Sequence, residues 1–147
     1  MPSSRDVRVV LAGALLAAVL GGCGGSSTLT DAQFRTQADS LCAAANKDTQ
    51  SFAASITQTS TDAEVTAAIR KTVTRTTRLV DDIANLNAPA DMTTDIASML
   101  ASVRAGLAQL AKVTSISDLM STDVTKGPYA QADQAANALG LKTCGKG

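Results

Sequence analysis

The chain has 147 residues, and its 13 basic and 13 acidic side chains give a formal net charge of zero. It contains two Phe, one Tyr and no Trp, so it offers little aromatic surface for stacking on nucleobases or sugars. Because there is no basic excess either, a nucleic-acid partner is not expected. The chain contains no His, which excludes Ser-His-Asp and Cys-His catalysis and the H-E-x-x-H class of metal site.

The first residues are typical of an export signal. Arg5 and Arg8 give a positive start, weakened by Asp6, and an uncharged apolar run follows from Val9 to Leu20. This run has about 12 residues, which is too short to span a bilayer as a helix but fits the apolar core of a secretory signal. We therefore predict that residues 1–22 are a signal peptide.

Cys23 follows Leu20-Gly21-Gly22, and this arrangement resembles the bacterial lipobox. The resemblance implies that Cys23 carries a diacylglyceryl group, that residues 23–29 are a lipidated cysteine and flexible tether, and that the protein is lipid-anchored on the extracytoplasmic face of the cell membrane. The alternative is an ordinary secretory signal with a cysteine nearby by chance. Cleavage before Cys23 leaves 125 residues with a net charge near −1, which suits one small domain over residues 30–147.

Two further cysteines, Cys42 and Cys144, remain after Cys23 is assigned to lipid. In an oxidising compartment such a pair favours a disulfide, which here closes a loop of about 100 residues. The alternative is two free or metal-binding thiols, but the chain has no His or nearby Cys to complete a metal site.

Capping signals and apolar spacing predict three regular helices. Thr30 with Gln33 and Thr61 with Glu64 form capping boxes at the start of the first two, and the second helix ends before Pro89. Apolar positions then recur at helical intervals. The three stripes are Phe34, Ala38, Leu41, Ala45, Phe52 and Ile56; Val65, Ile69, Val73, Thr76, Val80 and Ile83; and Met92, Ile96, Met99, Val103, Leu107, Leu110 and Val113.

The fourth segment is less regular. Ser117 is the expected cap of a short helix, Gly127-Pro128 interrupts it, and the helix resumes from Tyr129 to Leu139. Gly140 is a suitable C-cap, with Leu141 placed to cover the helix end. Four amphipathic helices with short connections predict an all-α fold, an antiparallel up-and-down four-helix bundle closed by one disulfide.

Two stretches, ADSLCAAAN at 38–46 and ALGLKTCG at 138–145, resemble the paired ends of small secreted or lipid-anchored actinobacterial proteins. In those proteins an alanine-rich helical domain is closed by a cysteine pair. The resemblance implies an extracytoplasmic helical domain in which Cys42 pairs with Cys144. It implies no activity.

Two polar groups are candidates for binding. Lys71, Arg75 and Arg78 share one side of the second helix and are suited to phosphate or lipid headgroups, but a solvated face with Arg78 near Asp81 and Asp82 explains them more simply. Asp39 and Asn46 share an edge of the first helix with Cys42. They form either a polar recognition patch or hydrogen bonds to the C-terminal tail, and we favour the tail.

The sequence indicates a binding protein rather than an enzyme. It has no Ser-x-x-Lys dyad and no calcium loop, and no catalytic, metal or cofactor residues are assigned. A hydrolase with paired carboxylates is the one enzyme class left open, but the acidic residues are scattered over polar helix faces. We expect a non-enzymatic, lipid-anchored module that binds or scaffolds an envelope protein. The alternative is a carrier of a small apolar ligand or acyl chain, held in a slot of the core. The predicted slot residues are Met92, Met99, Leu107 and Leu110.

Overall fold

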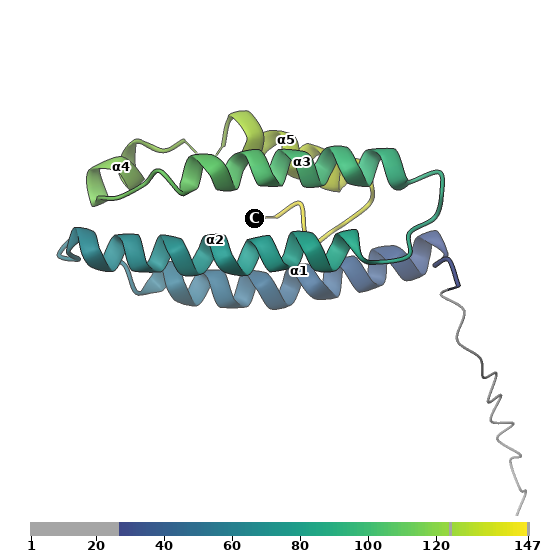
Figure 1. The fold of residues 1–147 in the computed structure, drawn as a ribbon, viewed down its shortest axis with the longest axis horizontal. Coiled ribbons are helices and arrows are strands. Elements are labelled where there is room, and N and C mark those ends of the chain that lie inside the picture. Colours follow the sequence, from purple (N-terminus) through teal and green to yellow (C-terminus); the bar gives the residue numbers. More distant parts are fainter. Residues whose placement is uncertain (1–26, 124, 147) are drawn as a thin grey trace, which may run out of the picture.

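The computed structural model describes residues 27–123 and 125–146. Within these residues the protein is all-α, with five helices and no strand (Figure 1). The predicted signal peptide and Cys23 lie outside the described residues. The helices are α1 (Asp31–Ala54), α2 (Asp62–Ala84), α3 (Thr93–Leu110), α4 (Ile116–Ser121) and α5 (Gly127–Ala138).

The two predicted capping boxes are confirmed. Thr30 precedes α1, its side chain accepts a hydrogen bond from the Gln33 backbone N–H, and the Gln33 side chain accepts one from the Thr30 N–H. Thr61 and Glu64 make the same reciprocal pair at the start of α2. Each box satisfies two backbone donors that the first turn of a helix leaves unpaired.

The fourth segment differs from the prediction at its start. Ser115, not Ser117, caps α4 by accepting a hydrogen bond from the Asp118 N–H at 3.1 Å. Gly127 and Pro128 do not interrupt a helix but begin α5, where the missing N–H of proline costs nothing. Val113, predicted within the third helix, lies beyond the end of α3 and is buried in the following loop.

The predicted end of the last helix is confirmed. Gly140 adopts a φ of 75°, in the left-handed region that favours glycine, and the Leu141 N–H donates to the Ala136 carbonyl oxygen at 2.9 Å. Leu141 is fully buried. This turn reverses the chain, so that the tail after α5, residues 141–146, runs back into the molecule.

The helices form two layers, one of α1 and α2 and the other of α3 and α5, with the C-terminal tail between them (Figure 1). Packing joins α1 with α2, α2 with α3, and α3 with α5. In the described part of the chain, no comparable packing joins α1 to α4 or α5. On the side between α1 and α5, the tail therefore links the two layers near the disulfide in place of direct packing between these helices.

The buried side chains form two clusters along the helix axes. The larger one surrounds Phe34, Cys42 and Leu141, and includes Met92 and Met99. The smaller one contains Val65, Ile69 and Val113. No helix among the described residues has the length and apolar character required to cross a membrane.

The capping box of α2 gives a pH prediction. Hydrogen bonds from the Thr61 N–H and hydroxyl hold the pKa of Glu64 below its usual value of 4.5. Because the folded pKa is the lower one, this contribution to stability is complete above pH 4.5 and is lost as the pH falls through the folded pKa.

Glu64→Gln keeps an acceptor that does not titrate, as Gln33 does in α1. The urea midpoint of the parent protein should therefore fall more steeply between about pH 5 and pH 3 than that of Glu64→Gln. Equal slopes for the two proteins would show that the Glu64 carboxylate does not stabilise α2.

Candidate functional site

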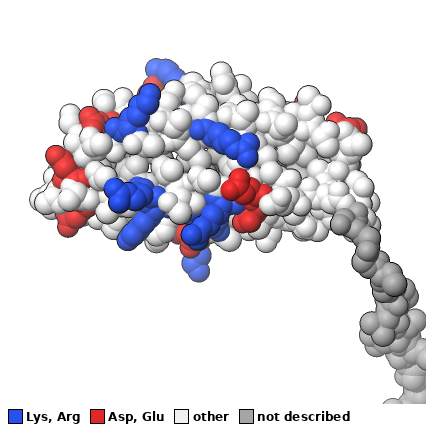
Figure 2. All heavy atoms as spheres, viewed as in Figure 1, with Lys and Arg blue, Asp and Glu red and all other residues white. Residues whose placement is uncertain are grey.

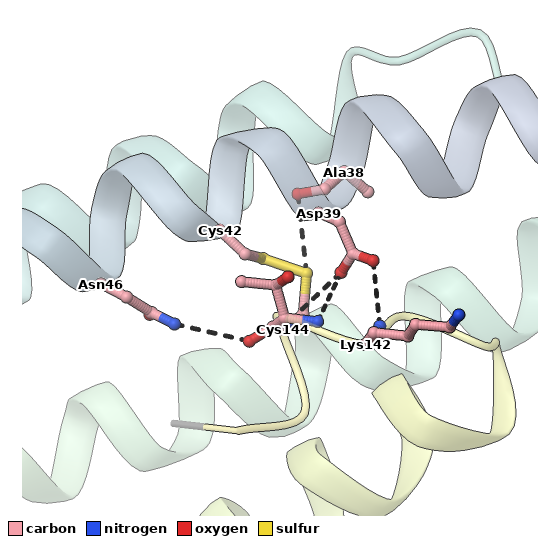
Figure 3. Close-up of a disulfide and its surroundings, with 7 residues drawn as sticks. Ala38, Asp39, Cys42, Asn46, Lys142 and Cys144 are labelled. Carbon is pink, nitrogen blue, oxygen red and sulfur yellow. Dashed lines mark hydrogen bonds between the residues drawn. A yellow bond between two sulfur atoms is a disulfide. The ribbon is translucent and has the colours of Figure 1, made fainter.

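A disulfide joins Cys42 of α1 to Cys144 of the tail, with a Cα–Cα distance of 5.2 Å (Figure 3). This confirms the predicted pairing. Cys42 lies about 16 Å along α1, since it is the twelfth residue of a helix that rises 1.5 Å per residue. The tail reaches it because the chain reverses at Gly140 and then runs between the two helix layers (Figure 1).

Hydrogen bonds from the same edge of α1 hold the tail on either side of the disulfide. The Asp39 carboxylate accepts from the backbone N–H groups of Lys142 and Thr143 at 3.0 and 2.7 Å, and more weakly from that of Cys144 at 3.4 Å. The Asn46 amide donates to the Thr143 carbonyl oxygen at 3.4 Å (Figure 3). Of the two interpretations of Asp39 and Asn46, the tail contacts are therefore the ones present in the fold.

Arg35 extends this edge by one more turn and was not among the predicted residues. Its Nε donates to the Leu139 carbonyl oxygen at 2.8 Å, so a cation lies at the C-terminal end of α5, where the helix dipole favours positive charge. We call the four residues Arg35, Asp39, Cys42 and Asn46 the tail clasp. Their spacings of four, three and four place them on one face of α1.

A cavity of about 850 Å³ begins at the disulfide and follows the helices toward α4. It borders both clusters of buried side chains. Its lining residues that are exposed come from the end of α1, the next loop and α4, so the cavity opens at that end. These are Gln50, Ala53, Thr57, Gln58 and Met120, the last of which is 81% exposed.

The walls of the cavity differ in chemistry. α2, α3 and α4 contribute mostly aliphatic side chains, whereas the α1 wall carries Asn46, Thr49 and Gln50. α5 contributes Tyr129, Ala132, Asp133 and Ala136 at positions i, i+3, i+4 and i+7 of one face. The cavity is therefore amphipathic, with an apolar side and a polar side.

Helix length and side-chain size explain why this space is not filled. α1 has 24 residues and α5 has 12, so α5 is only about half as long as α1, and the rest of the opposite layer is left to the short helix α4 and its loops. The α5 residues that face the cavity include two alanines, which reach only a short distance into it. Phe52 does not line the cavity; its ring lies 5.9 Å from the Lys71 Nζ.

Three of the four residues predicted to form an apolar slot line the cavity. These are Met99, Leu107 and Leu110. Met92 does not, because it is buried in the larger cluster near the start of α3. Sequence periodicity identified the face of the third helix but not where along that face the core is open.

Tyr129 and Asp133 of α5 were missed by the sequence analysis. The Tyr129 hydroxyl donates to the Gly106 carbonyl oxygen at 2.9 Å, and a Cβ at position 106 would lie 3.0 Å from the tyrosine ring. Glycine therefore allows the ring to pack closely on α3. Asp133 is partly buried, and desolvation raises the pKa of its carboxyl above the usual 3.8. The available signal was an aspartate within the stripe formed by Tyr129, Ala132 and Ala136.

Two of the three basic side chains predicted as a binding group on α2 already have partners within the fold. The Arg75 Nε lies 2.7 Å from an Asp48 carboxylate oxygen, and Lys71 lies over the ring of Phe52. Asp81 pairs with Arg104 of α3 at 3.7 Å instead of with Arg78. Figure 2 shows basic and acidic side chains interspersed on this face, which is the pattern of a solvated surface.

The described residues contain no group of three or more His, Cys, Asp or Glu side chains arranged to hold a metal ion. Comparisons of the chain with protein-family models, curated proteins and solved structures found no match. The candidate site is therefore the amphipathic cavity, closed at one end by the tail clasp.

The disulfide gives a stability prediction. Its two cysteines are 102 residues apart, and a loop of this length corresponds to about 4 to 5 kcal/mol of stabilisation in the chain-entropy model. Cys42→Ser, Cys144→Ser and the double variant should therefore lose similar free energies of unfolding, measured by urea denaturation without reductant. Clearly additive losses in the double variant would contradict a single shared bond.

The clasp carboxylate gives a second prediction. Asp39→Ala leaves up to three backbone N–H groups of the tail without their acceptor, so the free energy of unfolding should fall by about 1 to 3 kcal/mol. Asp82→Ala, at an exposed position of α2, is the control and should change it by less than about 0.5 kcal/mol. The urea midpoint of each oxidised protein measures the difference. Equal effects of the two substitutions would mean that Asp39 does not stabilise the tail.

Proposed function

We propose that this protein is a lipid-anchored, extracytoplasmic binding protein that carries a small ligand with an apolar part in the cavity between its helix layers, and that it is not an enzyme. The cavity is the observation that carries the proposal. Its volume of about 850 Å³ falls within the range of roughly 300 to 1,000 Å³ typical of small-molecule sites. The sequence favoured a module that binds an envelope protein, with the carrier as the alternative, and the cavity is what supports the carrier here.

The chemistry of the cavity supports the same function. Aliphatic side chains from α2, α3 and α4 form most of its wall. Apolar surface left in water is unfavourable, and a ligand that covers it gains about 25 cal/mol for each Å² removed from water. Burial of this wall by a ligand would therefore stabilise the folded protein as well as hold the ligand.

Support for anchoring comes from the sequence, and the disulfide adds support for export. The apolar run from Val9 to Leu20 and the Gly-Gly pair before Cys23 have the order of a lipoprotein signal. A disulfide such as Cys42–Cys144 is typical of proteins exported to an oxidising compartment.

We also propose that the five helices act as an antiparallel up-and-down four-helix bundle, in which α4 and α5 together occupy the fourth position. The packing of α1 with α2, α2 with α3 and α3 with α5 is what successive neighbours in such a bundle require. In this arrangement the cavity takes the place of the missing contact between the first and fourth helices.

Mass spectrometry of the exported, unreduced protein under native conditions tests the proposal. We expect a chain that begins at Cys23 and carries a diacylglyceryl group, a mass about 2 Da below that of the reduced form, and a bound species of lipid-like mass. A protein without any such species would leave an envelope protein as the better partner. Two free thiols would contradict the fold itself.

Filling the cavity should abolish binding. Thr76 of α2 lines the cavity and is partly buried, so the ring of Thr76→Phe would occupy it. This variant should lose the bound species and, without ligand, should melt at a higher temperature because the ring covers apolar wall. Thr77→Phe places the same ring at an exposed position of the same helix and should keep the bound species. Retention of the ligand by Thr76→Phe would place the ligand elsewhere on the protein.

A further inference from the structure

The cavity has one charged lining residue among the described residues, Asp133 of α5. Asp133 lies on the face of α5 that also presents Tyr129, Ala132 and Ala136 to the cavity. An acidic side chain in such a stripe is unusual, because partial burial of a carboxylate costs free energy unless it is paired. The position therefore calls for a reason beyond the stability of the helix.

No cation of the described residues compensates this carboxylate. The ion pairs present join Asp31 with Arg35, Asp48 with Arg75, Asp81 with Arg104, and Asp123 with Lys126. No Lys or Arg of the described part of the chain lines the cavity. Asp133 accepts no hydrogen bond from any described residue either, whereas Tyr129 beside it is satisfied by Gly106.

The pKa of the Asp133 carboxyl is raised because the group is desolvated and no positive partner among the described residues offsets this effect. A positive group placed in the cavity would reverse this effect, since an opposite charge nearby favours the ionised carboxylate. A carboxylate or phosphate ligand would instead find no positive side chain among the described lining residues, and its charge would be repelled by Asp133.

We propose that the cavity selects a single-chain amphiphile with a protonated amine, whose alkyl chain lies along the aliphatic wall and whose ammonium group contacts the Asp133 carboxylate. This inference rests on the proposed carrier function and specifies its ligand. An extended chain suits the cavity because its lining follows α1 from Cys42 to Ala53, about 16 Å along the helix axis. The polar groups of α1 at Asn46, Thr49 and Gln50 give the head group further hydrogen-bonding partners.

Tyr129 provides a direct readout, because it is the single tyrosine of a chain without tryptophan and it lines the cavity. The oxidised full chain is titrated at pH 7 with dodecylamine, dodecanol or dodecanoic acid while tyrosine fluorescence is followed, with the two ionised probes below their micelle concentrations and dodecanol below its solubility limit. We expect dodecylamine to bind about tenfold more tightly than dodecanol, as a charge-assisted hydrogen bond implies, and dodecanoic acid to bind most weakly.

The matched variants are Asp133→Asn and Asp82→Asn, the second at an exposed position outside the cavity. Asp133→Asn should reduce the affinity for dodecylamine to within about twofold of that for dodecanol and leave dodecanol binding unchanged, whereas Asp82→Asn should alter neither. Tighter binding of dodecanoic acid than of dodecylamine, or an amine preference that survives in Asp133→Asn, would overturn the inference while leaving the carrier function intact. Binding of none of the three probes would overturn both.

Discussion

The fold depends on the anchoring of the C-terminal tail to α1. The tail lies between the two helix layers, and the Cys42–Cys144 disulfide, the Asp39 carboxylate and the Asn46 amide fix it there. Fully buried Leu141 and the larger apolar cluster pack around the same point. Because α1 and α5 do not pack on one another as the other neighbours do, this covalent and hydrogen-bonded link is what holds the two layers in register on that side.

The same arrangement creates the cavity. A tail of six residues fills the space between the layers only near the disulfide, and α5 is half as long as α1. Beyond the tail, α2, α3 and α4 present aliphatic side chains to a space that no helix of the described chain fills. The disulfide thus has two roles, since it stabilises the fold and forms the closed end of the candidate binding site.

Local features of the fold were predictable from sequence, because they depend on residues close together in the chain. The capping boxes at Thr30 and Thr61 and the glycine turn at Gly140 are of this kind. The tail contacts of Asp39 followed from its position on the same helix edge as Cys42.

The cap of α4 was misassigned, although the Ser115-x-x-Asp118 pattern that marks it was present in the sequence. The lining of the cavity was predicted only in part, because helical periodicity identifies the buried face of a helix but not the length over which another helix covers that face. Asp133 became notable only when α5 was seen to face that space.

The two ends of the molecule have different surroundings. At one end the Leu29 N–H donates to the Asn87 carbonyl oxygen at 2.7 Å, which ties the first described residues to the segment after α2. The opening of the cavity lies beside α4 and the loop after α1. Figure 1 shows these two elements at the end of the fold far from the start of α1. The 24 residues of α1 separate these ends by about 36 Å. Any attachment made through the residues before Leu29 would therefore join the described fold at the end opposite the opening of the cavity.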